Sequence, residues 1–289
     1  MVTTLALAAA LSFALGNVLQ QRGTLETDAG ADDPRFLVQI LRRPVWLAGA
    51  VCQAAGWILQ AVALDLGPLS FVQSITTLSL VLALPLGARL TNQRITGTVV
   101  AGAVAVTAGV IIFVTVGAPS AGTSQPSGTV AFAATASTVV ACVVLSVLAR
   151  RRSAAMRAAL FGAAAGFAFG LQGAATKVFV THVGHGLLGL LSIWSTYLLV
   201  VSALLGFALQ QTGLKTGVLA PSIASSNAVT LFVSVLLGIV VFGEALGTSP
   251  ATRVVAWAGL AVALAGVAVL ATHAQAPPLS EEPGGLAVD

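Results

Sequence analysis

Long apolar runs separated by short polar connectors dominate the pattern of hydrophobic and polar positions along the chain. A helix needs about 20 apolar residues to cross the ~30 Å hydrocarbon core of a bilayer. Nine runs meet this requirement, and they lie near residues 2–21, 45–64, 68–88, 96–116, 129–149, 155–178, 187–209, 218–242 and 253–272. Backbone groups in lipid must be satisfied within a segment, and runs of this length are far longer than barrel strands. The pattern therefore predicts an all-α integral membrane protein with nine transmembrane helices.

The composition supports a lipid environment. Hydrophobic residues make up 57% of the 289 positions and charged residues only 8%, against about 25% charged residues in soluble domains. A chain so poor in charge cannot cover a water-facing surface, so the lipid bilayer is its expected partner. The net charge of +4 is small and the basic residues flank apolar runs, which indicates membrane topology and not nucleic-acid binding.

The basic residues predict an orientation, because cytoplasmic connectors are enriched in Lys and Arg. With nine spans, eleven of the thirteen basic residues fall on one side: Arg22, Arg35, Arg42, Arg43, Arg89, Arg94, Arg150, Arg151, Arg152, Arg157 and Lys215. Lys177 and Arg253 fall on the other side. We therefore expect a multi-pass protein of the cell membrane with its N-terminus outside and its C-terminus in the cytoplasm.

Two segments outside the spans have distinct patterns. Residues 23–43 contain an amphipathic stretch that could begin at Asp32 or Asp33 with Pro34 at its first helical position. This stretch predicts a short cytoplasmic helix that lies on the membrane interface and anchors the chain. The tail 274–289 is polar and rich in Pro and Gly, so we expect it to be disordered in the cytoplasm.

The chain contains a repeat. FALGNVLQ from Phe13 resembles FAFGLQGA from Phe167, GWILQAVALDLG from Gly56 resembles GFALQQTGLKTG from Gly206, and AGAVAVTAGV resembles AGLAVALAGV at residues 101–110 and 258–267. Five spans separate the starts of the copies, so the second copy is inverted relative to the first. This divides the chain into a first membrane repeat at 1–116, a linking span and basic loop at 117–152, a second repeat at 153–273 and the tail at 274–289. The fold expected is two inverted four-helix repeats joined by a linking helix.

The segment LLGIVVFGEALGTSPATRVVAWAGLAVALAGVAVL resembles the closing half-repeat of the drug/metabolite transporter superfamily, of EamA-like type, with Glu244 at its acidic position. In the first copy Ala88 stands where an acidic residue is usual. The segments FALGNVLQQRG, LDLGPLSFVQSITTLSLVLALPLGARL and VTVGAPSAG resemble the NIPA-type branch. That resemblance implies nine spans and an association with magnesium transport.

Polar residues inside the spans are the candidates for a substrate path, because polar groups in lipid must find partners or face a cavity. They are Asn17, Gln20, Gln53, Gln60, Gln73, Thr76, Thr77, Gln172, Ser225, Ser226 and Asn227. In the repeat alignment Thr76 and Thr77 correspond to Ser226 and Asn227. Isolated hydroxyl residues can serve only to join helices, whereas the amide stripes predict a hydrated path between the halves, with Asn17 and Gln20 facing inward. Pro85 and Pro221 are candidates for breaking their helices.

Acidic residues are absent from the middle of every predicted span, and Asp65 and Glu244 lie at span ends. A buried carboxylate that exchanges protons is therefore not expected. Glu244 could attract cations at the outer mouth of the path, or it could cap a turn near Arg253. Metal ligands cannot be assigned; transported Mg²⁺ would have to use amide, hydroxyl and carbonyl oxygens. No resident cofactor is expected.

These patterns favour a membrane transporter that moves a small solute by alternating access. A NIPA-like magnesium or divalent-cation transporter or channel is the alternative, and a non-transporting membrane scaffold is a third class. An enzyme is not expected, because paired carboxylates, or a His and Asp near a Ser, are not apparent. A homodimer is compatible with all three classes.

Overall fold

The computed structural model describes residues 1–25, 42–90, 96–120, 122–123, 125–214 and 219–273. This part of the chain is helical and contains no strand. Its helices are α1 (Val2–Leu25), α3 (Pro44–Leu66), α4 (Leu69–Thr76), α5 (Ser79–Leu90), α6 (Gly97–Val116), α7 (Gly128–Ala149), α8 (Ala154–Val180), the short 3-10 helix η1 (Val183–His185), α9 (Gly186–Ser192), α10 (Trp194–Leu214), α11 (Leu219–Phe242) and α12 (Pro250–His273). The amphipathic stretch predicted near Asp32 and the tail 274–289 lie outside these residues.

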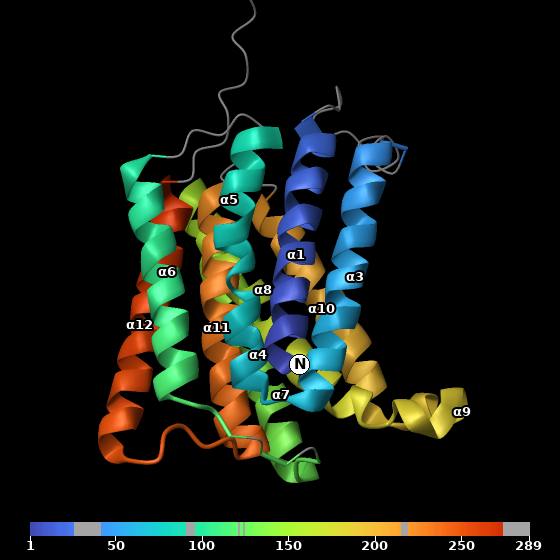
Figure 1. Ribbon diagram of the computed structural model, residues 1–289. Coiled ribbons are helices and arrows are strands. Elements are labelled where there is room, and N and C mark those ends of the chain that lie inside the picture. Colours follow the sequence, from blue (N-terminus) through green and yellow to red (C-terminus); the bar gives the residue numbers. More distant parts are fainter. Residues whose placement is uncertain (26–41, 91–95, 121, 124, 215–218, 274–289) are drawn as a thin grey trace, which may run out of the picture.

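Nine helical segments of the described chain are long and apolar enough to cross a membrane, which indicates a multi-span membrane protein. The all-α class and the number of spans predicted from the apolar runs are thus confirmed. The spanning helices run alternately up and down (Figure 1), so the first and last helical residues of the chain lie at opposite ends of the bundle.

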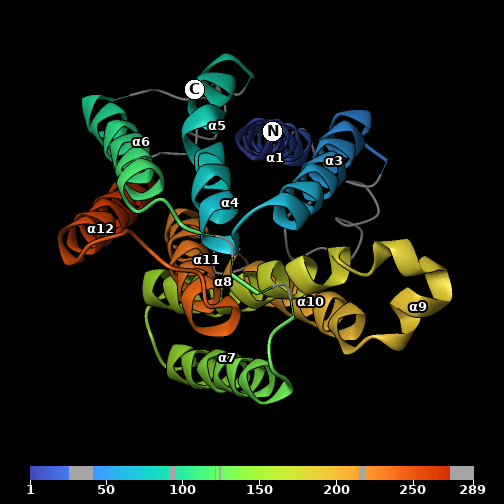
Figure 2. The same ribbon diagram turned by 60° about the horizontal axis from the view of Figure 1, so that its bottom comes forward.

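The predicted start of the seventh span, at residue 187, is wrong. Residues 186–192 form the separate helix α9, which projects sideways from the bundle (Figures 1 and 2), and the span itself runs from Trp194 to Gly213. The hydroxyls of Thr196 and Tyr197 donate to the carbonyls of Leu190 and Leu191 at 2.5 and 2.8 Å. These bonds satisfy carbonyls at the end of α9 and separate it from α10, a local competition that an apolar run does not reveal.

The third span is broken, but not at the predicted proline. The break separates α4 from α5 at Thr77 and Leu78, whereas Pro85 lies inside α5 and Pro221 lies in the first turn of α11. The amides of Leu78 and Leu80 bond to the carbonyls three residues back. The hydroxyls of Thr76 and Thr77 donate back to the carbonyl of Gln73, and such bonds compete with the helical ladder. Proline in the first turn of a helix costs little, because no helical hydrogen bond is lost there.

Helices pack against one another both within each predicted half and between the two halves. Within the first half α1 packs against α3, and within the second α8 packs against α10. The halves are joined where α6 packs along α12, where α4 packs against α8 and α11, and where α3 contacts α8. Figure 2 shows α8 and α11 near the centre of the bundle, with α7 on the outer side of α8.

The contact between α6 and α12 depends on reciprocal glycines. A β-carbon added to Gly109 would lie 2.5 Å from the carbonyl of Gly259, and one added to Gly266 would lie 2.8 Å from the carbonyl of Gly102. In the repeat alignment Gly102 corresponds to Gly259 and Gly109 to Gly266, so the two contacts exchange when the copies are exchanged. A two-fold relation between the copies would produce this pattern; the inverted repeat itself stays a prediction.

Small residues also bring α8 close to α11. β-Carbons added to Gly162 and Gly166 would lie 2.1 and 2.6 Å from the carbonyls of Ser222 and Ser226, and one added to Gly170 would lie 2.6 Å from Val233. The three glycines follow small-xxx-small spacing, which allows helix backbones to approach closely in a membrane, where apolar burial contributes little.

Candidate substrate path and a buried ion pair

The polar residues predicted on the third span lie where the two halves meet. Gln73 and Thr76 on α4 are each 6% exposed. A β-carbon added to Gly173 of α8 would lie 2.5 Å from Nε2 of Gln73, so this glutamine side chain packs directly on the second half. Thr76 Oγ1 lies 3.4 Å from Oε1 of Gln73. Amide and hydroxyl groups therefore occupy the interface beside the break between α4 and α5.

The residues of α11 that correspond to Thr76 and Thr77 in the repeat alignment are buried to the same degree. Thr76 and Ser226 are 6% and 5% exposed, and Thr77 and Asn227 are both half-buried. α4, which carries Gln73 and Thr76, packs against α11, which carries Ser226 and Asn227. The structure thus brings Gln73, Thr76, Thr77, Ser226 and Asn227 onto two helices that contact each other.

Other predicted path residues bond within one half. Ser225 Oγ donates to the carbonyl of Ala159 at 2.7 Å, so it joins α11 to α8. Gln172, on α8, is half-buried, and its carbonyl accepts a bond from Thr176 at 2.8 Å. The bond of Ser225 matches the role of polar residues as links between neighbouring helices, whereas the bond to Gln172 lies within α8.

The amide stripes of the first two spans face each other inside the first half. Gln20 packs on Gly49, and Gln53 packs on Gly16, where an added β-carbon would lie 2.6 Å from Gln53 Oε1. This oxygen is buried without a hydrogen-bond partner among the described residues. Gln60 is half-buried. Asn17 is exposed, and its place in a hydrated path stays a prediction.

Glu244 is buried, not placed in an open mouth. It is 2% exposed, and its carboxylate lies 2.7 Å from Nζ of Lys177, which is itself 6% exposed. The carboxylate also accepts hydrogen bonds from the amides of Leu69 and Ser70, at 2.5 and 3.0 Å, and from the hydroxyl of Ser70 at 2.5 Å. The Lys177 ammonium lies 4.7 Å from the centre of the Phe242 ring, within range of a cation–π contact.

This cluster corrects two expectations. Glu244 does act as a cap, but for the first turn of α4 in the other half and not for a turn near Arg253. A buried carboxylate therefore exists, although none lies in the middle of a span. Four donors converge on it, which matches the need of a buried charge for both a counter-ion and hydrogen bonds. Sequence reasoning missed the pair, because Lys177 and Glu244 are 67 positions apart; the signal available was that each is an isolated charge beside an apolar run.

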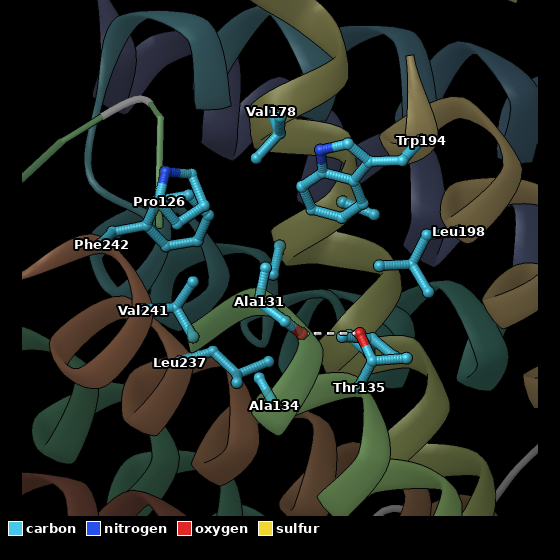
Figure 3. A pocket seen from close by; sticks show the side chains of 13 residues that line it. Pro126, Ala131, Ala134, Thr135, Val178, Trp194, Leu198, Leu237, Val241 and Phe242 are labelled. Atoms are coloured by element: carbon cyan, nitrogen blue, oxygen red, sulfur yellow. Dashed lines mark hydrogen bonds between the residues drawn. The ribbon is translucent and has the colours of Figure 1, made fainter. Parts of the chain in front are cut away.

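The apolar hollow drawn in Figure 3 lies among α7, α8, α10 and α11, next to this cluster. Its labelled side chains include Trp194, Leu198, Val241 and Phe242. The hydroxyl of Thr135 is bonded to the carbonyl of Ala131 at 2.8 Å, and the lining is almost entirely apolar. Phe242 forms the wall between the hollow and the Lys177 ammonium.

Metal binding by charged ligands finds no support in the described residues. They contain no group of three or more His, Cys, Asp or Glu residues placed to hold an ion. Neutral oxygens beside the break in the third span remain as possible ligands for a transported, partly hydrated cation.

The chain is similar to a bacterial protein over most of its length. The chain is 31% identical over 262 residues to the uncharacterized protein Cgl0250/cg0304 of Corynebacterium glutamicum, and the match covers 90% of this chain and 89% of that protein. No protein-family model matches the chain, and no solved structure is significantly similar to it.

Proposed function

The chain belongs to the same family as that Corynebacterium glutamicum protein, and we propose that it is a membrane transporter that moves a small solute by alternating access. The moving parts are two inverted repeats, α1–α6 and α8–α12, joined by α7. The substrate path runs between α4, α8 and α11, with Gln73, Thr76, Thr77, Ser226 and Asn227 as its polar lining.

The observation that carries this proposal is the break between α4 and α5. Discontinuous helices near the interface of repeats are typical of secondary transporters, because unwound turns offer backbone groups to a solute. The amides that would bond to the carbonyls of Ser74 and Thr76 in a continuous helix bond instead to those of Ile75 and Thr77. The buried side chains of Gln73 and Thr76 flank the same turn.

The burial of Lys177 strengthens the argument for the orientation that the basic residues suggest. Arg22, Arg89 and Arg150 lie at the end of the bundle opposite to Lys177 and Arg253. Lys177 is neutralised by Glu244, so Arg253 is the exposed basic residue left at its end within the described chain. The imbalance of exposed positive charge supports the proposal that the C-terminal end of α12 lies on the cytoplasmic side of a cell membrane.

Thiol accessibility tests the path. In a protein with Cys52 and Cys142 replaced by alanine, Thr76→Cys should react with a small membrane-impermeant methanethiosulfonate reagent. A hydrated path makes the thiol reactive from at least one side, whereas Phe132→Cys, exposed on α7 and facing lipid, should stay unreactive. A non-transporting scaffold predicts that Thr76→Cys is as unreactive as Phe132→Cys.

Magnesium permeation is the second candidate, supported by the NIPA-type resemblance and by the neutral oxygens beside the break. Proteoliposomes that enclose a Mg²⁺-sensitive dye distinguish it from a solute carrier. We expect Mg²⁺ entry no faster than into protein-free liposomes, with and without an imposed membrane potential. Entry that depends on the protein and responds to the potential would favour the cation pathway.

A further inference from the structure

We propose that Lys177, Glu244, Leu69 and Ser70 form a latch that closes the substrate path at the end of the bundle where α4 begins. The inference rests on the proposed transport function and adds the element that controls access from one side. The residues come from both halves: Leu69 and Ser70 begin α4 in the first, while Lys177 ends α8 and Glu244 follows α11 in the second.

The latch holds α4 through its own backbone. The first amides of a helix have no partner within the helix and carry a partial positive charge. Glu244 accepts two of these amides and the Ser70 hydroxyl. The carboxylate itself is fixed in place by the Glu244 amide, which donates to the carbonyl of Gly238 at 2.9 Å. Gly238 leaves the room for it, since a β-carbon there would lie 2.4 Å from Glu244 Oε2.

The latch lies directly over the proposed path. Along a helix rising 1.5 Å per residue, Gln73 is about 5 Å and Thr76 about 9 Å beyond Ser70. α4 cannot move away from α8 and α11 at this end while its first turn is bonded to Glu244. Opening therefore requires water or solute groups to replace the Leu69 and Ser70 donors around the buried carboxylate. Because this replacement is costly, the closed state persists until the latch is disrupted.

At the opposite end, the described residues of the first repeat offer no carboxylate in the position that Glu244 has in the second repeat. Ala88 occupies the position of Glu244 in the first copy and offers no carboxylate. Contacts between the halves at that end must use groups other than this carboxylate. The latch therefore acts on one side of the membrane only. An ion pair that only stabilises the fold would not have to be confined to one side.

Side-specific labelling of Thr76→Cys tests the latch in full-length protein reconstituted in vesicles, in the background that lacks Cys52 and Cys142. Thr248→Cys and Ser153→Cys, exposed at opposite ends, report from which side a reagent acts. A cationic and an anionic methanethiosulfonate reagent are both used, so that a changed charge does not imitate opening. K177M/E244Q removes both charges together, and Ser70→Ala removes one bond and serves as the milder variant. R253Q removes an exposed charge at the same end and is the matched control.

We expect K177M/E244Q to raise the labelling rate of Thr76→Cys from the Thr248 side at least tenfold with both reagents, and Ser70→Ala to raise it less. R253Q should leave the rate unchanged, and labelling from the Ser153 side should not rise in any variant. Equal rates in K177M/E244Q, Ser70→Ala and R253Q would overturn the latch while leaving the path intact. No labelling from either side in any variant, with both reference thiols reactive, would overturn the path and the latch together.

Discussion

Replacing Glu244 with alanine is expected to cause a large loss of stability. The substitution leaves the Lys177 ammonium buried without its counter-ion and removes the acceptor of the Leu69 and Ser70 donors. Removal of one partner from a buried ion pair costs about 3–5 kcal/mol. Thermal unfolding of the detergent-solubilised protein measures the effect. K177M should cost less, because the donors of α4 still hold the carboxylate.

The double variant K177M/E244Q separates the pair from the packing around it. It removes both charges and keeps side chains of similar length, so most of the stability lost in E244A should return. A double-mutant cycle with K177M and E244Q gives the coupling energy. Additive losses in that cycle would contradict a direct ion pair between the two side chains.

The second large effect is expected where α6 crosses α12. A β-carbon on Gly109 would lie 2.4 Å from the amide nitrogen of Ala263 and 2.5 Å from the carbonyl of Gly259, both of them backbone atoms that cannot rotate away. Gly109→Val should therefore force the helices apart, at a cost of about 1–3 kcal/mol or more for overpacking. The unfolding temperature in detergent measures this cost.

Gly97→Ala provides the matched control on the same helix, because nothing lies within 4 Å of a β-carbon at that position. Its unfolding temperature should stay close to that of the original protein. Gly266→Ala tests the reciprocal contact, since its β-carbon would lie 2.6 Å from the amide nitrogen of Val106. If Gly109→Val were as stable as Gly97→Ala, α6 and α12 would not pack at this distance.

The apolar runs were sufficient to predict the class and number of spans, because span length is set by bilayer thickness and not by tertiary contacts. The runs did not show where helices are interrupted. The third span changes from α4 to α5 at Thr77 and Leu78, and α9 is separate from α10, although prolines were the more obvious candidates for such interruptions.

The candidate site was harder to predict than the fold. Helical spacing shows that Gln20 lies on the same face of α1 as Asn17, but not which neighbouring helix that face meets, and Gln20 packs on α3 inside its own half. The Lys177–Glu244 pair depends on three segments distant in sequence. Pairing of this kind depends on how distant segments pack together. No pattern in the single sequence shows that these segments contact one another.

If the proposed latch closes one entrance of a carrier, the two resting conformations have unequal free energies. Every 1.4 kcal/mol between two states changes their ratio tenfold, so even a fraction of the latch energy would leave the empty carrier facing the compartment at the end where α5 terminates. With the orientation proposed from the arginines, that compartment is the cytoplasm. The binding site of the empty carrier would then be open to solute from inside the cell for most of the time.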